Sequence, residues 1–529
     1  MLKIEGYADR LSVQPGDEIG FHISTNASSY DIEIARVGAT REPVWRRAGL
    51  EGRDYPTPEN ASSYGCGWPA ALQLSVPQEW QSGYYSAMLH ASAADGRTAI
   101  GELSFVVRSA HPGRDTSILL QLTTNTDCAY NTWGGYTFYS GPDGPARRLS
   151  FARPFAGFRL DESLFLFDVE SAYTDKLNER VVEDRLQSEF SAHGFPLTRH
   201  IAMTVEEPGL LWHIHDPGGI YAVRKEGSRL RVYDGYTVWE SCWHHWQQPF
   251  VAWAERAGFR LDYAVNGDLE FHPEILENYR LVLSVGHDEY WSSPMRDSLE
   301  AFIAGGGNAA FFSGNNVWWQ VRFEEEGRDL VCWKEDYEQD PVYAEGNHGL
   351  LSTIWSHRLV DRPENQLTGV CFAYGGYHRF FDQFQDSEGA YTVHRPDHWV
   401  FAGTGLERGD LLGAKDKIVG YECDGCEIDW QDGLPVPTYN DGTPDGFEIL
   451  ATAQAALTAA DNSLTLVPAA MWGAGSDRKL PQPGAAVLGT YTRGGTVFTT
   501  GCTDWSEGLR GGDSVVEQIS HNVLARLSK

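Results

Sequence analysis

The chain has 529 residues, of which 42% are hydrophobic, and it contains 18 Trp, 24 Tyr and 24 Phe. This content of large apolar side chains excludes a disordered or fibrous protein, and the length exceeds what one hydrophobic core normally holds, so we expect more than one domain. The formal net charge of −31 would repel phosphate backbones and anionic lipid head groups, which argues against nucleic-acid and membrane partners.

The first residues, MLKIEGYADRLSVQPGDEIG, lack the basic and apolar regions of a secretory signal. No apolar run in the sequence approaches the length needed to span a bilayer. The eight cysteines are too sparse for a disulfide framework in a chain of this length, which is typical of thiols in a reducing compartment. We therefore expect a cytoplasmic protein.

Residues 1–108 alternate polar and apolar positions between turns that contain glycine and proline. Segments of this kind include LSVQPGDEIGFHIST, YDIEIARVG and IGELSFVVRS. Several short strands with such spacing predict an N-terminal β-sandwich domain over residues 1–108. It ends at SAHPGRD, a linker-like stretch, and a second domain covers residues 109–529.

The second domain opens with the apolar run SILLQLTT, which indicates a strand covered on both faces. A loop rich in Tyr, Trp, Asn and Gly follows it and contains Tyr130 and Tyr139. A tyrosine in such a loop is more often a packing residue with a hydrogen-bonded hydroxyl than a ligand, and both interpretations stay open at this point. Residues 247–258 have helical spacing, and FRLDYAV predicts another strand.

Residues 280–319 predict a strand, a helix and a second strand, the unit that builds a parallel sheet. We expect the strands at Leu281 to Val285 and at Ala309 to Ser313. Polar residues follow both strands, and open α/β sheets bind ligands at the carboxyl ends of their strands. The sequence therefore predicts functional residues in this segment, at the carboxyl ends of the two strands.

His287 and Glu289 follow the first of these strands, two positions apart, so their side chains point to the same side. An imidazole beside a carboxylate is a common metal-ligand or acid/base pair. The alternative is a loop hydrogen-bonded to its own backbone, with Glu289 exposed. The position at the ligand-binding edge favours a functional role.

Residues from about 320 to 450 show no clear periodicity and are rich in Gly, Asp, His and aromatic residues. We interpret them as a loop-rich excursion of short strands from the sheet. Within it, Glu422 and Asp424 follow a short apolar run, where a carboxylate would either face the cleft as a general base or lie in a solvated turn. Cys423 and Cys426 form a single CxxC, which is weak evidence for zinc beside the interpretation of ordinary thiols in a tight turn.

The C-terminal part returns to regular patterns. AAVLGTYT and GTVFTTG predict strands, and VVEQISHNVLARL predicts a closing helix. The elements together indicate an α/β protein with an N-terminal β-sandwich.

Several motifs taken in order resemble the family of the N,N-dimethylformamidase large (beta) subunit. They are AYNTWGGYTFY, PFVAWAERAG, SVGHDEYW, FFSGNNVWW, IVGYE and GTVFTTGCTDW. The resemblance covers nearly the whole chain, and it rests on the combination of AYNTWGG, GHDEYW and GNNVWW rather than on any one of them. It implies a catalytic α/β domain with a parallel sheet like that of glutamine amidotransferases, carrying β and loop insertions.

The resemblance also implies a mononuclear Fe(III) site that hydrolyses the C–N amide bond of small N-substituted formamides such as N,N-dimethylformamide. Carried onto matching positions, the metal ligands are Tyr130, Tyr139 and Glu289. Phenolate and carboxylate oxygens suit a hard cation, including other oxygen-preferring metals such as Mn. A trivalent ion also explains how a phenol with an ordinary pKa near 10 ionises at neutral pH.

Four further residues have roles implied by the same resemblance. His287 is a partner of the ligands, Asn315 and Lys334 line the pocket, and Glu422 is a candidate base. The family's dimethylformamidase carries an inserted lectin-like domain for which this chain has no room, and it works with a small subunit. We therefore expect a homo-oligomer, with a small subunit as a further partner, and we note that Asp127 stands where relatives often have another tyrosine.

Two other classes of function compete with this amidohydrolase. The first is a binding or assembly subunit that keeps the fold without turnover. The second is cysteine-nucleophile chemistry of the amidotransferase type, which is disfavoured because Asn315 and Asn316 follow the Ala309 to Ser313 strand where a cysteine would be needed. Convergence of Tyr130, Tyr139 and Glu289 separates the enzyme from the binder.

Overall fold

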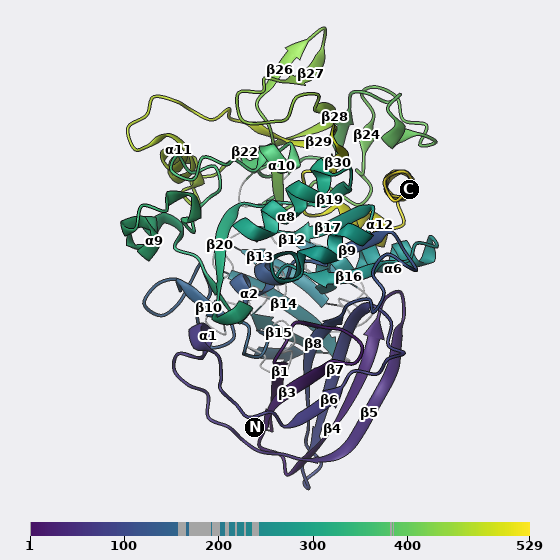
Figure 1. The fold of residues 1–529 in the computed structure, drawn as a ribbon, viewed down its shortest axis with the longest axis vertical. Coiled ribbons are helices and arrows are strands. Elements are labelled where there is room, and N and C mark those ends of the chain that lie inside the picture. Colours follow the sequence, from purple (N-terminus) through teal and green to yellow (C-terminus); the bar gives the residue numbers. More distant parts are fainter. Residues whose placement is uncertain are drawn as a thin grey trace.

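A computed structural model gives the architecture of the chain (Figure 1). The N-terminal strands lie at one end of the molecule, a large sheet with helices lies in the middle, and the β26–β27 hairpin projects at the opposite end. The structure describes residues 2–156, 165–168, 192, 202–206, 211–216, 219–226, 229–234, 243–380, 383–384 and 386–529.

Two sheets make up the N-terminal region. The first has three antiparallel strands and the second has five strands, of which only the β2–β8 pair is parallel. The first contains, in sheet order, β1 (Ile4–Ala8), β3 (Glu18–Thr25) and β6 (Leu72–Ser75). The second contains β2 (Ser12–Val13), β8 (Thr98–Val107), β7 (Gly83–Ser92), β4 (Ser29–Val37) and β5 (Arg41–Glu51).

The two N-terminal sheets share one apolar core. Phe21 of β3 packs against Phe105 of β8 with 5.7 Å between ring centroids, and Phe105 lies 5.5 Å from Tyr85 of β7. The alternation of apolar and polar residues places every second side chain in this core. β5 departs from this alternation because nearly all its side chains are exposed at the sheet edge, and β1 departs in the opposite sense because all five of its residues are buried. The domain boundary at residue 108 stays a prediction.

The central sheet has nine strands. Five neighbouring strands are parallel, and four antiparallel strands extend the sheet from β30. In sheet order they are β16 (Asp262–Val265), β9 (Ile118–Leu122), β17 (Leu281–His287), β19 (Asn308–Gly314), β30 (Gly495–Thr499), β29 (Gly484–Arg493), β28 (Glu448–Ala455), β23 (Tyr391–Val393) and β24 (Leu411–Leu412).

Helices cover both faces of the central sheet. On one face, apolar side chains of β9, β17 and β19 share a core with α6 (Gln248–Arg256), α12 (Trp505–Arg510) and α13 (Ser514–Leu527). On the other face, the alternate residues of the same strands pack against α8 (Ser293–Ala304). Because both faces of these strands are covered, their sequences are continuous apolar runs.

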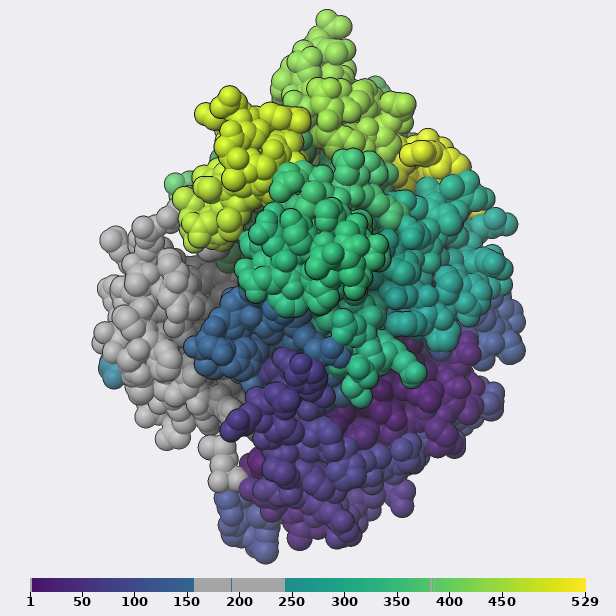
Figure 2. Space-filling view, turned by 60° about the vertical axis from the view of Figure 1, so that its left-hand side comes forward, coloured from purple at the N-terminus to yellow at the C-terminus, as the bar shows by residue number. Residues whose placement is uncertain are grey.

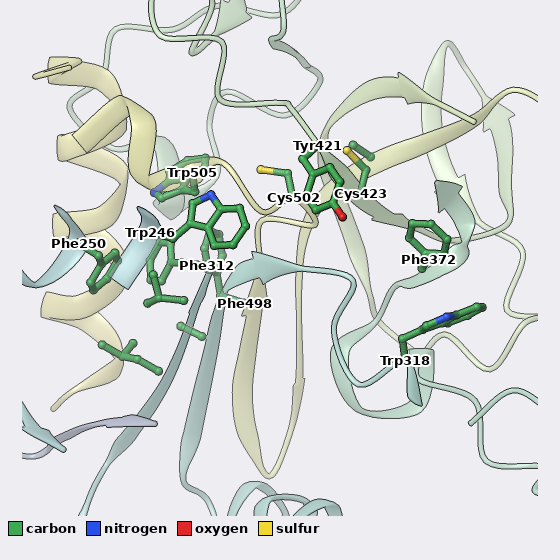
Figure 3. Close-up of a cluster of buried hydrophobic side chains, with 14 of the residues drawn as sticks. Trp246, Phe250, Phe312, Trp318, Phe372, Tyr421, Cys423, Phe498, Cys502 and Trp505 are labelled. Carbon is green, nitrogen blue, oxygen red and sulfur yellow. The ribbon is translucent and has the colours of Figure 1, made fainter. Parts of the chain in front are cut away.

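Phe312 of β19 is the centre of an aromatic cluster on the first face (Figure 3). Its ring lies 5.0 Å from Phe250, 5.3 Å from Phe498 and 6.0 Å from Trp505, measured between centroids. Ring pairs at these distances contribute packing energy beyond the area they bury. The cluster therefore fixes the strand that ends at Gly314, directly before the asparagine pair.

Small sheets and short helices surround the carboxyl edge of the parallel strands. β18 (Tyr290–Ser292) pairs parallel with β20 (Trp319–Glu324), which continues through β21 (Asp329–Val331) to β10 (Arg148–Ser150). β22 (Cys371–Tyr377) pairs with β25 (Glu422–Gly425), and β26 (Ile428–Gln431) with β27 (Leu434–Pro437). Of these strands, β21, β22, β25, β26 and β27 lie in the stretch from about 320 to 450 that was expected to be loop-rich.

A further antiparallel sheet is described by its backbone. In sheet order it contains β11 (Phe165–Asp168), β15 (Arg229–Asp234), β14 (Gly219–Glu226), β13 (Leu211–Asp216) and β12 (Ala202–Glu206). The other helical segments among the described residues are α1 (Ala61–Tyr64), α2 (Thr124–Tyr130), η2 (Trp243–Gln247), α7 (Asp268–Phe271), η3 (Pro273–Asn278), η4 (Glu325–Gly327), η5 (Lys334–Gln339), α9 (Pro341–Ala344), η6 (His348–Leu350), α10 (Asn365–Thr368), η7 (Trp399–Phe401) and α11 (Ser463–Trp472).

The segment after β9 differs from its expected form. The sequence predicts a loop from Thr124, whereas Thr124–Tyr130 forms the helix α2. Tertiary contacts explain the difference, because the backbone N–H of Asn125 donates to Asn266 and its side-chain amide donates to the carbonyl of Tyr290. Polar residues that looked like loop are therefore buried, and Tyr130 lies at the end of a helix.

The space-filling view shows the N-terminal strands as one end of the molecule and the chain near residue 430 as the opposite tip (Figure 2). Among the described residues, no helix is both long and apolar enough to cross a membrane. The likeness of the central sheet to glutamine amidotransferases stays a prediction.

Candidate functional site

Tyr130, at the end of α2, and Tyr139, in the loop beyond it, stack with 4.8 Å between ring centroids. Their phenol oxygens lie 3.0 Å apart. The Tyr130 hydroxyl donates to Oε2 of Glu289 at 2.8 Å, and the Tyr139 hydroxyl donates to Oε1 of the same carboxylate. Two phenols and one carboxylate, distant in sequence, therefore meet at one point.

Glu289 lies between β17 and β18 and is 1% exposed. Its backbone N–H donates to the hydroxyl of Thr126 in α2 at 3.0 Å, and its carbonyl accepts from the backbone N–H of Trp319 at 2.9 Å. The indole Nε1 of Trp319 also donates to Oε1 of Glu289 at 2.7 Å and lies 3.3 Å from the Tyr139 hydroxyl. The carboxylate is thus oriented by both backbone and side-chain bonds.

Lys334 begins the short helix η5 and its ammonium lies 3.1 Å from the centroid of the Tyr139 ring. It is also 4.5 Å from the Trp319 ring centroid, so the ammonium makes cation–π contacts with both rings. Nζ of Lys334 is buried and has no hydrogen-bond partner among the residues that the structure describes. Burial lowers the pKa of Lys334 to about 8, although the nearby carboxylate of Glu289 opposes that shift.

His287, the last residue of β17, joins the phenol–carboxylate cluster to a second carboxylate. Its Nε2 lies 3.4 Å from Oε2 of Glu289 and 2.8 Å from Oε2 of Glu422, which begins β25. Asn315 follows β19 and donates from Nδ2 to the same Glu422 oxygen at 3.1 Å. The seven residues expected at the site therefore form one contiguous cluster.

The electrostatics of this cluster follow from burial. Burial is the largest influence on Glu289 and raises its pKa, with Glu422 acting in the same direction and His287 and Lys334 in the opposite one. His287, Glu289 and Glu422 are each at most 3% exposed. Carboxyls so removed from water need protons or cations close to them, because their charged forms are poorly solvated.

The donor set of Tyr130, Tyr139 and Glu289 fits a hard trivalent cation. Ionised, it supplies two phenolates and one carboxylate, which are the oxygen ligands such a cation prefers. The oxygen separations of 3.0 Å between the phenols and 2.8 Å to Glu289 are about those of neighbouring ligands in an octahedral site with bonds of about 2.0–2.1 Å. Within the described ranges, no group of three or more His, Cys, Asp or Glu offers a different metal centre.

The cluster meets solvent at Tyr139. That side chain is 39% exposed, whereas Tyr130, Lys334 and Asn315 are at most 4% exposed. Trp246, which precedes α6, closes the inner side, because its ring meets that of His287 edge to face at 6.0 Å. The arrangement gives a polar centre with one accessible side and aromatic walls, as is usual for small-ligand sites.

Two sequence alternatives are excluded by these positions. Glu289 is not an exposed loop residue, and Glu422 does not lie in a solvated turn, since both are buried and bonded. Cys423 and Cys426 are buried free thiols, with the Cys423 Sγ donating to the carbonyl of Gly420.

Sequence reasoning missed two residues around the site, Trp319 and Thr126, and it left the role of Asp424 open. Trp319 was visible only as part of FFSGNNVWW, and its role depends on the parallel pairing of β18 with β20. Thr126 was hidden by the loop interpretation of α2. Asp424 was paired with Glu422 in the sequence, and it is buried and bonded to Asn316, while burial raises its pKa to about 7.

Comparisons with known proteins agree with the resemblance seen in the motifs. A family model described as N,N-dimethylformamidase beta subunit-like, C-terminal, matches residues 31–519. The N,N-dimethylformamidase beta subunits of Paracoccus aminophilus and an Alcaligenes species are 23% and 24% identical over 313 residues. Each alignment covers 54% of this chain and 37% of the relative, so the match spans little more than a third of the relatives' length.

Two solved structures show remote likenesses to parts of this chain. CopC from Methylosinus trichosporium OB3b is 17% identical with a TM-score of 0.13, over 20% of this chain and 96% of that chain. The sporulation control protein Spo0M from Bacillus subtilis is 12% identical with a TM-score of 0.15, over 22% of this chain and 51% of that chain. TM-scores this low support no structural argument.

Proposed function

The chain belongs to the N,N-dimethylformamidase beta subunit-like family, and from that premise we propose that it hydrolyses the C–N bond of a small N-substituted amide such as N,N-dimethylformamide. The observation that carries the proposal is the meeting of Tyr130, Tyr139 and Glu289 beside the His287–Glu422 pair. The first set is suited to hold a hard cation and the second to move a proton. A binding subunit has no need for both.

Tyr130, Tyr139 and Glu289 would hold a mononuclear ferric ion, because their donor chemistry and spacing fit one. Such an ion supplies Lewis acidity toward an amide carbonyl and the positive charge that keeps two phenols ionised at neutral pH. Trp319 holds the Glu289 carboxylate in place through its indole N–H. This part of the site is a binding centre built by residues from α2, the following loop and the β17–β18 turn.

Glu422, with His287 beside it, would carry out the proton transfers of the reaction. Hydrolysis adds the oxygen of water to the carbonyl carbon and breaks the C–N bond, so one water proton must leave the oxygen and one proton must reach the departing nitrogen. Glu422 accepts the first and returns it to nitrogen, which yields a carboxylic acid and an amine. His287, 2.8 Å from Glu422, and Asn315, 3.1 Å from it, orient that carboxylate.

Lys334 would bind the amide oxygen. Its buried ammonium lies against the ring of Tyr139, the most exposed residue of the cluster, and has no hydrogen-bond partner within the described ranges. A carbonyl oxygen is the acceptor that an otherwise unpaired buried donor favours. The rings of Tyr139 and Trp319 beside it suit small apolar N-substituents.

The chain would act in an assembly. Its curated relatives are named as beta subunits, which supports a multi-subunit state for this chain, either several copies of itself or copies joined by a small subunit. The cytoplasmic location stays a prediction. Light scattering on the purified chain measures the copy number, and co-expression with a candidate small subunit tests the second arrangement.

Product analysis of the purified chain tests the proposed function. Protein loaded with ferric iron is incubated with N,N-dimethylformamide, and formate and dimethylamine are quantified together. We expect equal amounts of both products, one iron per chain, and a visible absorption band from phenolate-to-iron charge transfer. Glu289→Gln should lose both the iron and the products, because a neutral amide is a poor ligand for a hard cation.

Glu59→Gln is the matched control, since Glu59 is exposed on the N-terminal region. It should keep the metal content and turnover of the unmodified chain. A colourless protein that binds no iron and releases no amine from any small amide would refute the hydrolase and leave the binding subunit as the function.

A further inference from the structure

Two adjacent asparagines hold two carboxyl groups of β25. Asn315 donates to Glu422 at 3.1 Å, and Asn316 donates to Oδ2 of Asp424 from both its side chain, at 2.7 Å, and its backbone N–H, at 3.1 Å. Glu422 and Asp424 are two positions apart on one strand, so their side chains point to the same side. The turn after β19 therefore fixes one carboxyl that belongs to the proposed site and one that does not.

The side chain of Asn316 is fixed from its other side by Ser313 of β19. The Ser313 hydroxyl donates to Oδ1 of Asn316 at 2.6 Å, and Nδ2 of Asn316 donates to the Ser313 carbonyl at 2.8 Å. These bonds determine the orientation of the amide, because its oxygen faces a hydroxyl donor and its nitrogen faces a carbonyl acceptor. Asn316 therefore fixes the position of the Asp424 side chain relative to β19.

The bonds continue from Ser313 to the turn that carries Glu289. The Oγ of Ser284, on the neighbouring strand β17, lies 2.9 Å from Oγ of Ser313 and 2.7 Å from Oδ2 of Asp288. Because Ser313 gives its own proton to Asn316, Ser284 donates its single proton to one of these two neighbours at a time. Asp288 lies between His287 and Glu289 in the sequence. Five side chains thus form a continuous line of close polar contacts from β25 to the β17–β18 turn, and we name it the brace: Asp424, Asn316, Ser313, Ser284 and Asp288.

Every member of the brace is at most 3% exposed. A buried polar side chain is costly unless it is bonded, so such a line persists only where its bonds are made together. The turn it supports is strained, because Asn315 has φ 47° and Val317 has φ 56°, in the left-handed region. Such conformations are kept only where surrounding contacts determine them.

The brace connects the two strands that carry the proposed proton-moving pair. His287 is the last residue of β17 and Glu422 is the first residue of β25, and these strands belong to different sheets. The strands alone therefore do not set the 2.8 Å between His287 Nε2 and Glu422 Oε2. Backbone contacts also hold β25, through its pairing with Tyr377 of β22 and through the bond from the N–H of Thr503 to the Glu422 carbonyl, but these contacts place the strand and do not orient the Glu422 carboxylate.

We propose that Asp424 and Asn316 are positioning residues, which hold Glu422 and Asn315 against His287 through the brace. The inference rests on the proposed function, and it names residues outside the reacting cluster on which that function depends. Ser284 and Ser313 then act as the middle links. The brace itself touches neither substrate nor metal.

Asp424→Ala removes the acceptor at the end of the brace and tests the proposal. We expect kcat for the amide to fall by about 10- to 100-fold with KM changed by no more than about threefold, because misplacement by a fraction of an ångström affects the chemical step more than binding. Asp424→Asn keeps an acceptor oxygen for both donors and should retain kcat within about threefold. Ser284→Ala and Ser313→Ala should give intermediate losses.

Asp441→Ala is the matched control. Asp441 is another buried aspartate, which accepts from the backbone N–H groups of Glu427 and Thr443 away from the brace. It should lower the unfolding midpoint as Asp424→Ala does, but leave kcat unchanged. If Asp424→Ala fails to fold, the two serine variants decide instead.

Equal kcat losses in Asp424→Ala and Asp441→Ala, or unaltered kcat in the brace variants, would overturn the proposal. A crystal structure of Asp424→Ala or Ser313→Ala separates this inference from the proposed function. A Glu422 carboxylate displaced from His287 supports the brace even if the chain hydrolyses no amide. An unmoved Glu422 refutes it.

Discussion

Tyr130 donates a 2.8 Å hydrogen bond to Oε2 of Glu289, from the end of α2 to the turn after β17. Tyr139 bonds to the other oxygen of the same carboxylate. A carboxyl group that is 1% exposed thus has a phenol on each oxygen, and replacing the two phenol protons by one hard cation would convert a hydrogen-bonded cluster into a ligand set. The proposed chemistry depends on this replacement of the phenol protons by a cation.

Tyr130→Phe and Tyr139→Phe each remove one phenol oxygen and keep the stacked ring. We expect each variant to weaken the visible charge-transfer band of the iron-loaded protein and to lower kcat by about 100-fold or more, equivalent to about 2.7 kcal/mol of transition-state stabilisation. The double variant should be colourless. Absorption spectra of protein with measured iron content check this prediction.

The control for the tyrosine variants is Tyr64→Phe. Tyr64 is 57% exposed at the end of α1, away from the cluster, so its band and turnover should match those of the unmodified chain. If Tyr130→Phe and Tyr139→Phe leave an unchanged band, the colour does not come from these phenolates and the ligand assignment is wrong.

The strands and helices around the site follow closely from the sequence. The expected strand Leu281 to Val285 is β17, which extends to His287, because the parallel ladder with β19 continues past the apolar run as far as the His287–Gly314 pair. Local patterning was sufficient here, since a strand buried on both faces must be apolar wherever it crosses the core.

The parts that the sequence did not predict depend on tertiary bonds. α2 forms from polar residues whose partners, such as Asn266, come from more than a hundred positions away. Trp319 contacts Glu289 only because β20 pairs with β18. The periodicity of the local sequence carries no information about such partners, so it indicates a loop where α2 forms and does not predict the bonds of Trp319.

Trp319→Phe removes the indole donor and keeps an aromatic ring. Glu289 then loses its 2.7 Å bond from Nε1, and we expect the affinity for iron to fall by about tenfold, because groups that orient a metal ligand typically affect affinity by about 10- to 100-fold. Competition with a chelator of known affinity measures the change. Trp430→Phe, on the exposed hairpin strand β26 and 57% exposed, should bind iron as the unmodified chain does. Equal affinities in both variants would show that Trp319 does not orient Glu289.

Asp268→Asn tests the contact between the N-terminal sheets and α7, the helix that follows β16. Asp268 is 3% exposed and accepts from Ser12 of β2 at 2.6 Å, while Arg108 lies 3.3 Å from the same oxygen. Loss of the carboxylate leaves a buried guanidinium without its charge partner, so we expect the free energy of unfolding to fall by roughly 3 kcal/mol. Urea unfolding followed by tryptophan fluorescence measures it.

Asp95→Asn breaks an ion pair of similar length but at the surface, where Asp95 and Arg97 are 2.8 Å apart with more than half of each side chain exposed. It should lower the free energy of unfolding far less than Asp268→Asn does, because solvent screens an exposed ion pair. Should the two aspartate variants lose equal stability, burial is not what makes the Asp268–Arg108 contact important.

Glu364 lies directly before α10 and is fully buried. Burial raises the pKa of its carboxyl from 4.5 to about 8, although Arg296 opposes the shift. Between those two values the folded chain holds a proton that the unfolded chain has released. The stability from this group is therefore complete below about pH 4.5 and is lost as the pH rises toward about 8, above which no further change is expected.

Glu364→Gln replaces this acid by a neutral group of the same shape, so the variant should lose that part of the pH dependence. Relative to the unmodified chain, we expect it to gain a few kcal/mol of unfolding free energy between about pH 5 and pH 8, with a slope of about 1.4 kcal/mol per pH unit within the window. Urea unfolding at several pH values measures both chains. Glu59→Gln, at an exposed position, should leave the curve unaltered. Parallel curves for the unmodified chain and Glu364→Gln would mean that the folded protein keeps Glu364 ionised, with the buried guanidinium of Arg296 outweighing its desolvation.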